Sequence, residues 1–149
     1  MKHRKRESGQ TLLELVIALG VVAVVITALV SAVTASLRYS QATRFRSRAV
    51  KFAQEGVELT RKVRDEQPWS TFFAYTGGDG RWCLDASGVW TDDDGNGTCP
   101  LAAGDNFWRS VHFSWDDTED IMIVTVRVSW GDRSTPSTVE LVTHFTEWK

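Results

Sequence analysis

The sequence predicts an α+β protein in which one long N-terminal helix packs on a small antiparallel β-sheet. Three observations lead to this fold class: an uncharged apolar run at residues 15–37, a helical stripe of apolar residues within 45–63, and strand-like alternation within 107–145. The chain has 149 residues, of which 42% are hydrophobic and 24% charged. This composition is typical of one folded domain with an appendage and not of a disordered chain.

Charge is distributed unevenly along the chain, although the net charge is only −2. Residues 1–9 carry four Lys or Arg and one Glu, whereas residues 67–149 carry five Lys or Arg and thirteen Asp or Glu. Residues 31–66 are again basic, with eight Lys or Arg and four acidic residues. The small net charge argues against a dedicated nucleic-acid-binding protein, which is usually strongly basic.

The apolar run from Leu15 to Leu37 has no ionisable side chain. A helix of about 20 apolar residues spans the hydrocarbon core of a bilayer, so the run predicts a transmembrane helix. A buried core helix is the alternative, but a chain this short rarely buries a helix on all sides. A secretory signal is disfavoured because the run is long and lacks a small-x-small cleavage site. The basic residues 1–9 then predict a cytoplasmic N-terminus, which puts the acidic segment 67–149, the outer body, on the other side of the membrane.

Glu14 lies at the start of this apolar run. A charged side chain in a membrane helix is costly and is a candidate functional residue by default. The alternative is a glutamate that stays hydrated at the lipid headgroups, and its position alone does not decide between the two.

The segment around Glu14 has a distinctive order: a basic leader, Gly9, the five residues QTLLE from Gln10 to Glu14, and the apolar run. This order resembles the prepilin signature of type IV pilins and pseudopilins. The resemblance implies that a membrane peptidase cleaves between Gly9 and Gln10 and that Gln10 is then N-methylated. It also implies that Glu14 serves assembly by pairing with the free amine of Gln10, since a paired buried charge costs less than a lone one.

Two features depart from the family pattern. Gln10 stands where the family usually has Phe, and no Pro precedes Pro68, whereas major pilins often carry a helix-kinking Pro near the position of Ser31. The missing Pro favours a minor pilin or a pseudopilin over a major subunit.

The resemblance implies four parts of the chain: a cleaved basic leader at 1–9, a transmembrane and assembly helix at 10–37, an amphipathic stem helix at 38–66, and an extracytoplasmic β-rich head at 67–149. It implies a minor pilin or pilin-like structural subunit of a type IV pilus. The alternatives are a pseudopilin of a type II-like secretion system and a single-span surface adhesin or receptor that binds carbohydrate or DNA.

Partners and location follow from the same resemblance. The expected partners are other pilin subunits, a prepilin peptidase, the inner-membrane assembly platform and membrane lipid, with a sugar or DNA as a further surface ligand. The precursor is expected in the cytoplasmic membrane as a single-pass protein. After assembly it is expected in an extracellular pilus or in a periplasmic or cell-wall pseudopilus.

The stem shows an apolar stripe with alternating spacings of four and three residues, which predicts an amphipathic helix. Pro68 disfavours helix at the preceding residue, so the helix is expected to end near Glu66. The stripe consists of Phe45, Ala49, Phe52, Gly56, Leu59 and Val63.

Beyond the stem, apolar residues alternate with polar ones in three segments, 107–115, 122–130 and 139–145. We expect three antiparallel strands in a meander, packed on the apolar stripe of the stem. A short hairpin is expected at 81–91. Of the seven Trp residues, most should lie in the core, whereas Trp82 and Trp90 beside the hairpin turn are candidates for exposure and for stacking on a sugar or a partner.

Cys83 and Cys99 are the two cysteines, and both fall in the outer body. An even number of cysteines in an oxidising compartment predicts a disulfide.

Between them, Asp92, Asp94 and Asn96 match the opening of an EF-hand loop, where alternating oxygen ligands converge on Ca²⁺. Ala103 stands where the bidentate Glu is expected, and a plain acidic turn is the alternative. Calcium is therefore the one cofactor to consider. The sequence has no phosphate-binding loop, nucleophile elbow or paired-carboxylate motif, so we do not expect an enzyme.

Overall fold

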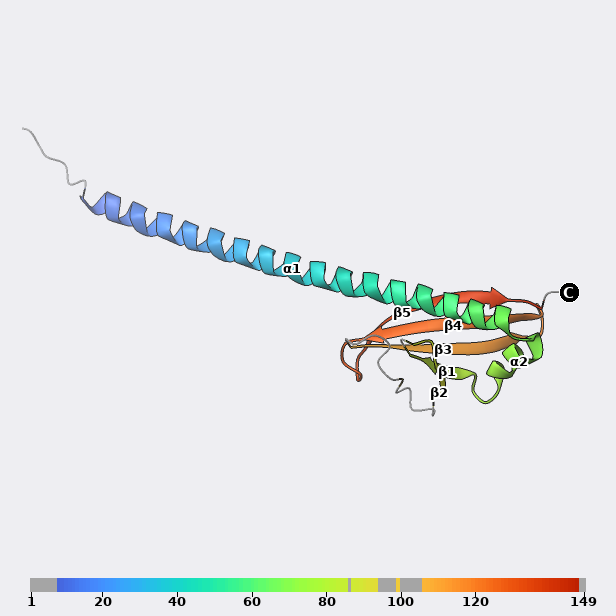
Figure 1. Ribbon diagram of the computed structural model, residues 1–149. Coiled ribbons are helices and arrows are strands. Elements are labelled where there is room, and N and C mark those ends of the chain that lie inside the picture. The colour runs from blue at the N-terminus through green and yellow to red at the C-terminus, as the bar shows by residue number, and fades with distance from the viewer. Residues whose placement is uncertain (1–7, 86, 94–98, 100–105, 148–149) are drawn as a thin grey trace, which may run out of the picture. The chain divides into compact units, whose positions relative to one another are not determined.

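The computed structural model describes residues 8–85, 87–93, 99 and 106–147 (Figure 1). Its contacts divide the chain into two compact units, Met1–Arg44 and Phe45–Lys149. Helix α1 (Ser8–Glu66) contributes to both units and ends at the residue that Pro68 predicts. The α+β fold class is confirmed, because the later part of α1 packs on an antiparallel sheet.

In the first unit, α1 exposes every described side chain from Thr11 to Arg44. Its most apolar window has a mean hydropathy of 2.9, and none of that window is buried. The hydroxyls of Thr27 and Thr34 donate hydrogen bonds to carbonyl oxygens one turn earlier, at 3.1 Å to Ala23 and 3.0 Å to Val30. An apolar helix whose hydroxyls bond within the helix is suited to lipid, which offers no hydrogen-bonding partners.

The second unit contains one five-stranded antiparallel sheet with the strand order β2-β1-β3-β4-β5. The three predicted strands form its centre and one edge, and the predicted hairpin joins the same sheet at the side of β3. The sequence pattern predicts the hairpin but not its place in the sheet. The strands are β1 (Arg81–Leu84), β2 (Trp90–Asp92), β3 (Phe107–Asp116), β4 (Ile121–Trp130) and β5 (Ser137–Phe145).

The inner face of the sheet, which lies against α1, is set by the register of β3 and β4. Val111 pairs with Val126, and Phe113 pairs with Val124, so apolar side chains of neighbouring strands share one face. All four of these side chains are buried. Because side chains alternate along a strand, the residues between them form an outer face turned away from α1.

Helix α1 approaches the inner face along a line of small residues. Ala49, Ala53, Gly56 and Thr60 are buried there. The predicted stripe lacked Ala53 and Thr60, because it followed the larger apolar side chains that flank the line of closest contact. The Thr60 hydroxyl donates a hydrogen bond of 2.8 Å to the Gly56 carbonyl oxygen, which satisfies this buried polar group within the helix.

A short connection that the sequence analysis missed, α2 (Trp69–Phe73) and the 3-10 helix η1 (Ala74–Thr76), closes one end of the core. The fully buried ring of Phe72 lies 5.8 Å from that of Phe113, and the ring of Tyr75 lies 5.0 Å from that of Trp82. Trp82 and Trp90 are half-buried in this aromatic cluster. They are therefore not the exposed stacking platforms that the sequence suggested.

We predict that Gly56→Ala destabilises the second unit, although Gly→Ala in a helix usually stabilises by about 1 kcal/mol. A Cβ on Gly56 would lie 2.7 Å from Cγ1 of Val126 and 3.0 Å from Cδ of Arg109. Overpacking of this kind costs about 1–3 kcal/mol. Chemical denaturation of the full chain in detergent, followed by Trp fluorescence, measures the change.

Gly20→Ala is the matched control, because a Cβ there meets nothing within 4 Å. It should leave the denaturation midpoint of the second unit unchanged. A Gly56→Ala variant as stable as the wild type would show that α1 does not need this close approach.

Candidate functional sites

The first candidate site is the start of α1, where Gly9 and Gln10 follow Ser8 within the helix. Their side chains lie outside the part that the structure describes. Gln10 and Glu14 are four residues apart in the sequence, a separation of about one helical turn. Glu14 is exposed between Leu13 and Leu15, whose exposed fractions are 65% and 61%. A carboxylate is thus surrounded by apolar surface at the end that the resemblance assigns to processing and assembly.

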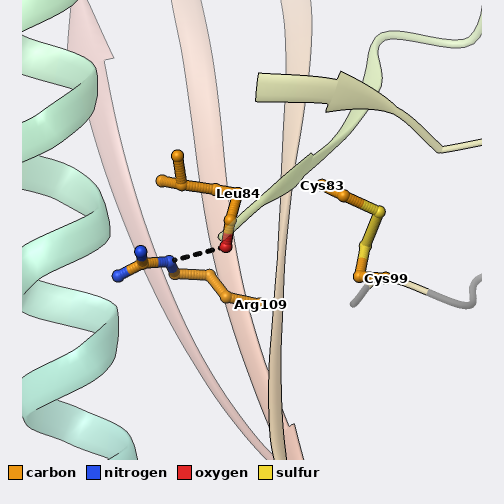
Figure 2. The surroundings of a disulfide bond; sticks show 4 residues. All are labelled: Cys83, Leu84, Cys99 and Arg109. Carbon is orange, nitrogen blue, oxygen red and sulfur yellow. Dashed lines mark hydrogen bonds between the residues drawn. A yellow bond between two sulfur atoms is a disulfide. The ribbon is translucent and has the colours of Figure 1, made fainter. Parts of the chain in front are cut away.

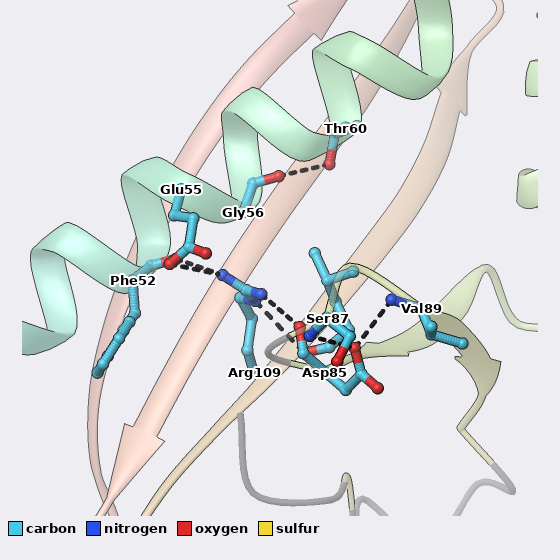
Figure 3. Close-up of polar contacts among 9 residues, drawn as sticks. Phe52, Glu55, Gly56, Thr60, Asp85, Ser87, Val89 and Arg109 are labelled. Carbon is cyan, nitrogen blue, oxygen red and sulfur yellow. Dashed lines mark hydrogen bonds and ion pairs between the residues drawn. The ribbon is translucent and has the colours of Figure 1, made fainter. Parts of the chain in front are cut away.

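A second feature is the buried guanidinium of Arg109 on β3, which is only 1% exposed (Figure 3). It donates hydrogen bonds of 2.9 Å to the Phe52 carbonyl oxygen of α1 and 2.8 Å to the Asp85 carbonyl oxygen beyond β1. Glu55 of α1 lies 3.7 Å from the same guanidinium. Burial lowers the pKa of Arg109, and the negative charges of Glu55 and Asp85 oppose that shift.

Arg109 therefore connects the helix, the hairpin and the centre of the sheet. The alternating pattern of residues 107–115 predicts a strand at this position but no role for Arg109. The sequence does distinguish Arg109 from other charged residues. It occupies one of the alternate positions of β3 that are otherwise apolar, between Phe107 and Val111. A charged residue on a core face must find polar partners inside the protein.

The loop after β1 holds one of these partners in place. The Asp85 carboxylate accepts hydrogen bonds from the backbone amides of Ser87, at 2.8 Å, and Val89, at 2.9 Å (Figure 3). This arrangement fixes the turn of the hairpin and leaves the Asp85 carbonyl oxygen to Arg109.

A disulfide joins Cys83 and Cys99, which are 16 positions apart in the sequence (Figure 2). Both cysteines are buried with Trp108 on the outer face, whereas the Arg109 guanidinium extends toward α1. The ligand atoms of Asp93 and the two cysteines lie within 4.8 Å of one another. Because both sulfurs belong to the disulfide, they provide no thiolates for a metal ion.

The calcium hypothesis falls largely on residues that the structure does not describe. Asp92 is an exposed residue of β2 and pairs with Trp82 of β1. Asp94 and Asn96 lie outside the described residues. The calcium site therefore stays a prediction.

Comparison with known proteins identifies the N-terminal segment. The prokaryotic N-terminal methylation motif matches residues 4–30, and this motif is the signature of type IV pilins and pseudopilins. The chain thus carries the signature of a membrane-anchored, pilin-like or pseudopilin precursor, and the motif implies processing by a prepilin peptidase and assembly with other pilin subunits. Families with this motif are structural and not enzymatic. Searches of curated proteins and of solved structures found no match.

We predict that reduction of the Cys83–Cys99 disulfide destabilises the second unit by about 3 kcal/mol, the value expected for a loop of this length. The measurement is chemical denaturation of the full chain in detergent, with and without a reductant. A Cys83→Ala and Cys99→Ala double variant is the control, because reductant should not change its stability. Identical midpoints for oxidised and reduced wild type would contradict the prediction.

Proposed function

We propose that the chain is a minor pilin-like subunit, which a prepilin peptidase cleaves after Gly9 and which enters a filament through its N-terminal helix. The observation that carries the proposal is the methylation motif at residues 4–30, which includes most of the uncharged run at residues 15–37. The most apolar part of the helix is not buried at all. In this proposal residues 1–9 are the leader, 10–37 the membrane and assembly segment, 38–66 the stem and 67–149 the head.

The exposed helix supports assembly on energetic grounds. Its large apolar side chains are about 50–67% exposed from Leu12 to Val33, so they need lipid before assembly and other helices after it. Transfer of such a helix from lipid to a helix bundle changes the hydrophobic free energy little, because its apolar side chains are shielded from water in both environments. Specific polar contacts then have a large influence on the arrangement of subunits.

Glu14 is the residue proposed to supply that contact. Cleavage after Gly9 creates an amine on Gln10, and an amine and a carboxylate in an apolar environment attract each other strongly. Pairing between neighbouring subunits offsets two desolvation penalties and selects one axial offset between the helices. N-methylation of Gln10 keeps the positive charge, so it is compatible with this pairing.

A pseudopilin is the second candidate, and the continuity of α1 from Ser8 to Glu66 without a Pro suits it equally. The two roles differ in where the mature chain is found. A pilus subunit is recovered in filaments sheared from the cell surface, whereas a pseudopilin stays with the cell envelope. Fractionation of intact cells distinguishes the two.

We predict that Gly9→Leu blocks removal of the leader, because a large side chain at the cleaved bond does not fit a site that accepts glycine. Intact-mass measurement should show the wild-type chain beginning at Gln10 and the variant beginning at or near Met1. A wild-type chain that retains residues 1–9 in the assembled fraction would contradict the proposal.

We predict that Glu14→Leu leaves membrane insertion and cleavage intact but reduces incorporation into filaments. Loss of about 1.4 kcal/mol at one contact weakens association about tenfold, which sets the scale of the expected decrease. Co-fractionation with filaments, at equal amounts in the membrane, measures it. Glu14→Asp keeps the charge and should retain more incorporation than Glu14→Leu. Equal incorporation of Glu14→Leu and wild type would make Glu14 a hydrated interfacial residue.

A further inference from the structure

The outer face of the sheet carries a groove with a volume of about 510 Å³. The register of the strands explains its polar floor. Ser110 of β3 pairs with Arg127 of β4, which in turn pairs with Glu140 of β5. Ser129 of β4 pairs with Thr138 of β5 in the same way. Hydroxyl groups and charged groups therefore lie side by side on the floor of the groove.

Basic side chains are concentrated at this groove. Residues 67–149 have a net charge of −8, yet the described part of this segment contains four arginines, of which three line the groove: Arg81, Arg127 and Arg133. The fourth is the buried Arg109. Among the described residues that line the groove, two are acidic, Asp93 and Glu140. The described lining is therefore net positive within a strongly acidic head.

The arginines are held by different contacts. Arg127 forms an ion pair of 2.6 Å with Glu140, and Arg81 lies 3.9 Å from Asp79. The Arg133 guanidinium lies over the ring of Trp108, 5.2 Å from its centroid. Stacking on an aromatic ring restrains the plane of a guanidinium, which lowers the entropy lost when its N–H groups bind a planar anion.

We propose that this groove binds a carboxylated sugar. Arginine recognises a carboxylate through two parallel hydrogen bonds, and Arg81 and Arg133 provide such donors. Sugar hydroxyls both donate and accept hydrogen bonds, which matches the hydroxyls of Ser110 and Thr138 and the carboxylate of Glu140. The volume falls within the range of sites for small ligands, about 300–1,000 Å³.

The structure argues against a nucleic acid in the same groove. Single-stranded nucleic acids are bound by a long basic track with exposed aromatic rings for base stacking. In the described lining of the groove, the one Trp, Phe or Tyr residue is Trp108, and it is only 8% exposed. The acidic remainder of the head would repel an extended polyanion. A short ligand with one or a few carboxylates avoids both problems, and this inference does not depend on assembly into a filament.

The test uses the full chain in detergent micelles and titrates it with trigalacturonate by isothermal titration calorimetry. Maltotriose is the uncharged sugar probe, and a 12-nucleotide single-stranded DNA is the polyanion probe. We expect binding of trigalacturonate, with maltotriose and DNA at least about tenfold weaker. Arg81→Gln and Arg133→Gln should each weaken trigalacturonate binding about tenfold, while Arg133→Lys should retain part of it.

Arg61→Gln is the matched control, because Arg61 is an exposed arginine of α1 paired with Glu58 and lies outside the groove lining. It should leave the affinity for trigalacturonate unchanged. Denaturation midpoints of all variants confirm that the head is folded. Absence of trigalacturonate binding, equal affinity for maltotriose, tighter binding of DNA, or equal losses in Arg61→Gln and Arg133→Gln would each overturn the proposal.

Discussion

The second unit depends on one buried cation, the Arg109 guanidinium. A buried charge is tolerated only where hydrogen-bonding partners surround it, and Arg109 takes these partners from α1 and from the turn after β1. The helix must therefore lie close to the sheet, which the small residue Gly56 permits, and the turn must be fixed, which the Asp85 carboxylate achieves. At the far end of α1, Arg64 adds a second polar anchor through the Thr146 carbonyl oxygen.

The two faces of the sheet consequently have different roles. Apart from Arg109, the described core residues of the inner face are mainly apolar and pack beneath α1, so their side chains hold the fold together. The outer face carries the polar groove and a small buried cluster, the Cys83–Cys99 disulfide with Trp108. Arg133 lies in the exposed turn between β4 and β5. Such a position accepts polar and charged side chains at little cost in stability, which is why a binding surface would be located there. Assembly is assigned to the first unit, so the two proposed activities use separate parts of the chain.

Periodic patterns of apolar residues predicted the helices and strands that bury one face against the core. The alternation of β3, β4 and β5 and the end of α1 before Pro68 are confirmed within one or two residues, because burial on one face imposes a strict period. The sequence could not place Arg109, whose partners are separated from it by 57 and 24 residues. It likewise missed the groove, since four separate strands, the β4–β5 turn and Asp93 after β2 contribute its described lining. Gly9, Gln10 and Glu14 came from a resemblance to pilins, and the motif match supports that resemblance for residues 4–30.

The central claim is that Glu14 pairs with the amine that cleavage creates on Gln10. A carbodiimide joins a carboxylate to an amine that already contacts it, so treatment of assembled filaments, followed by mass spectrometry of their peptides, reports this pairing. The account predicts a cross-link from Glu14 of one subunit to an N-terminal amine at residue 10, in this chain or in a neighbouring pilin. Filaments whose chains begin at Met1, or in which Glu14 is cross-linked only to lysine side chains, would contradict it.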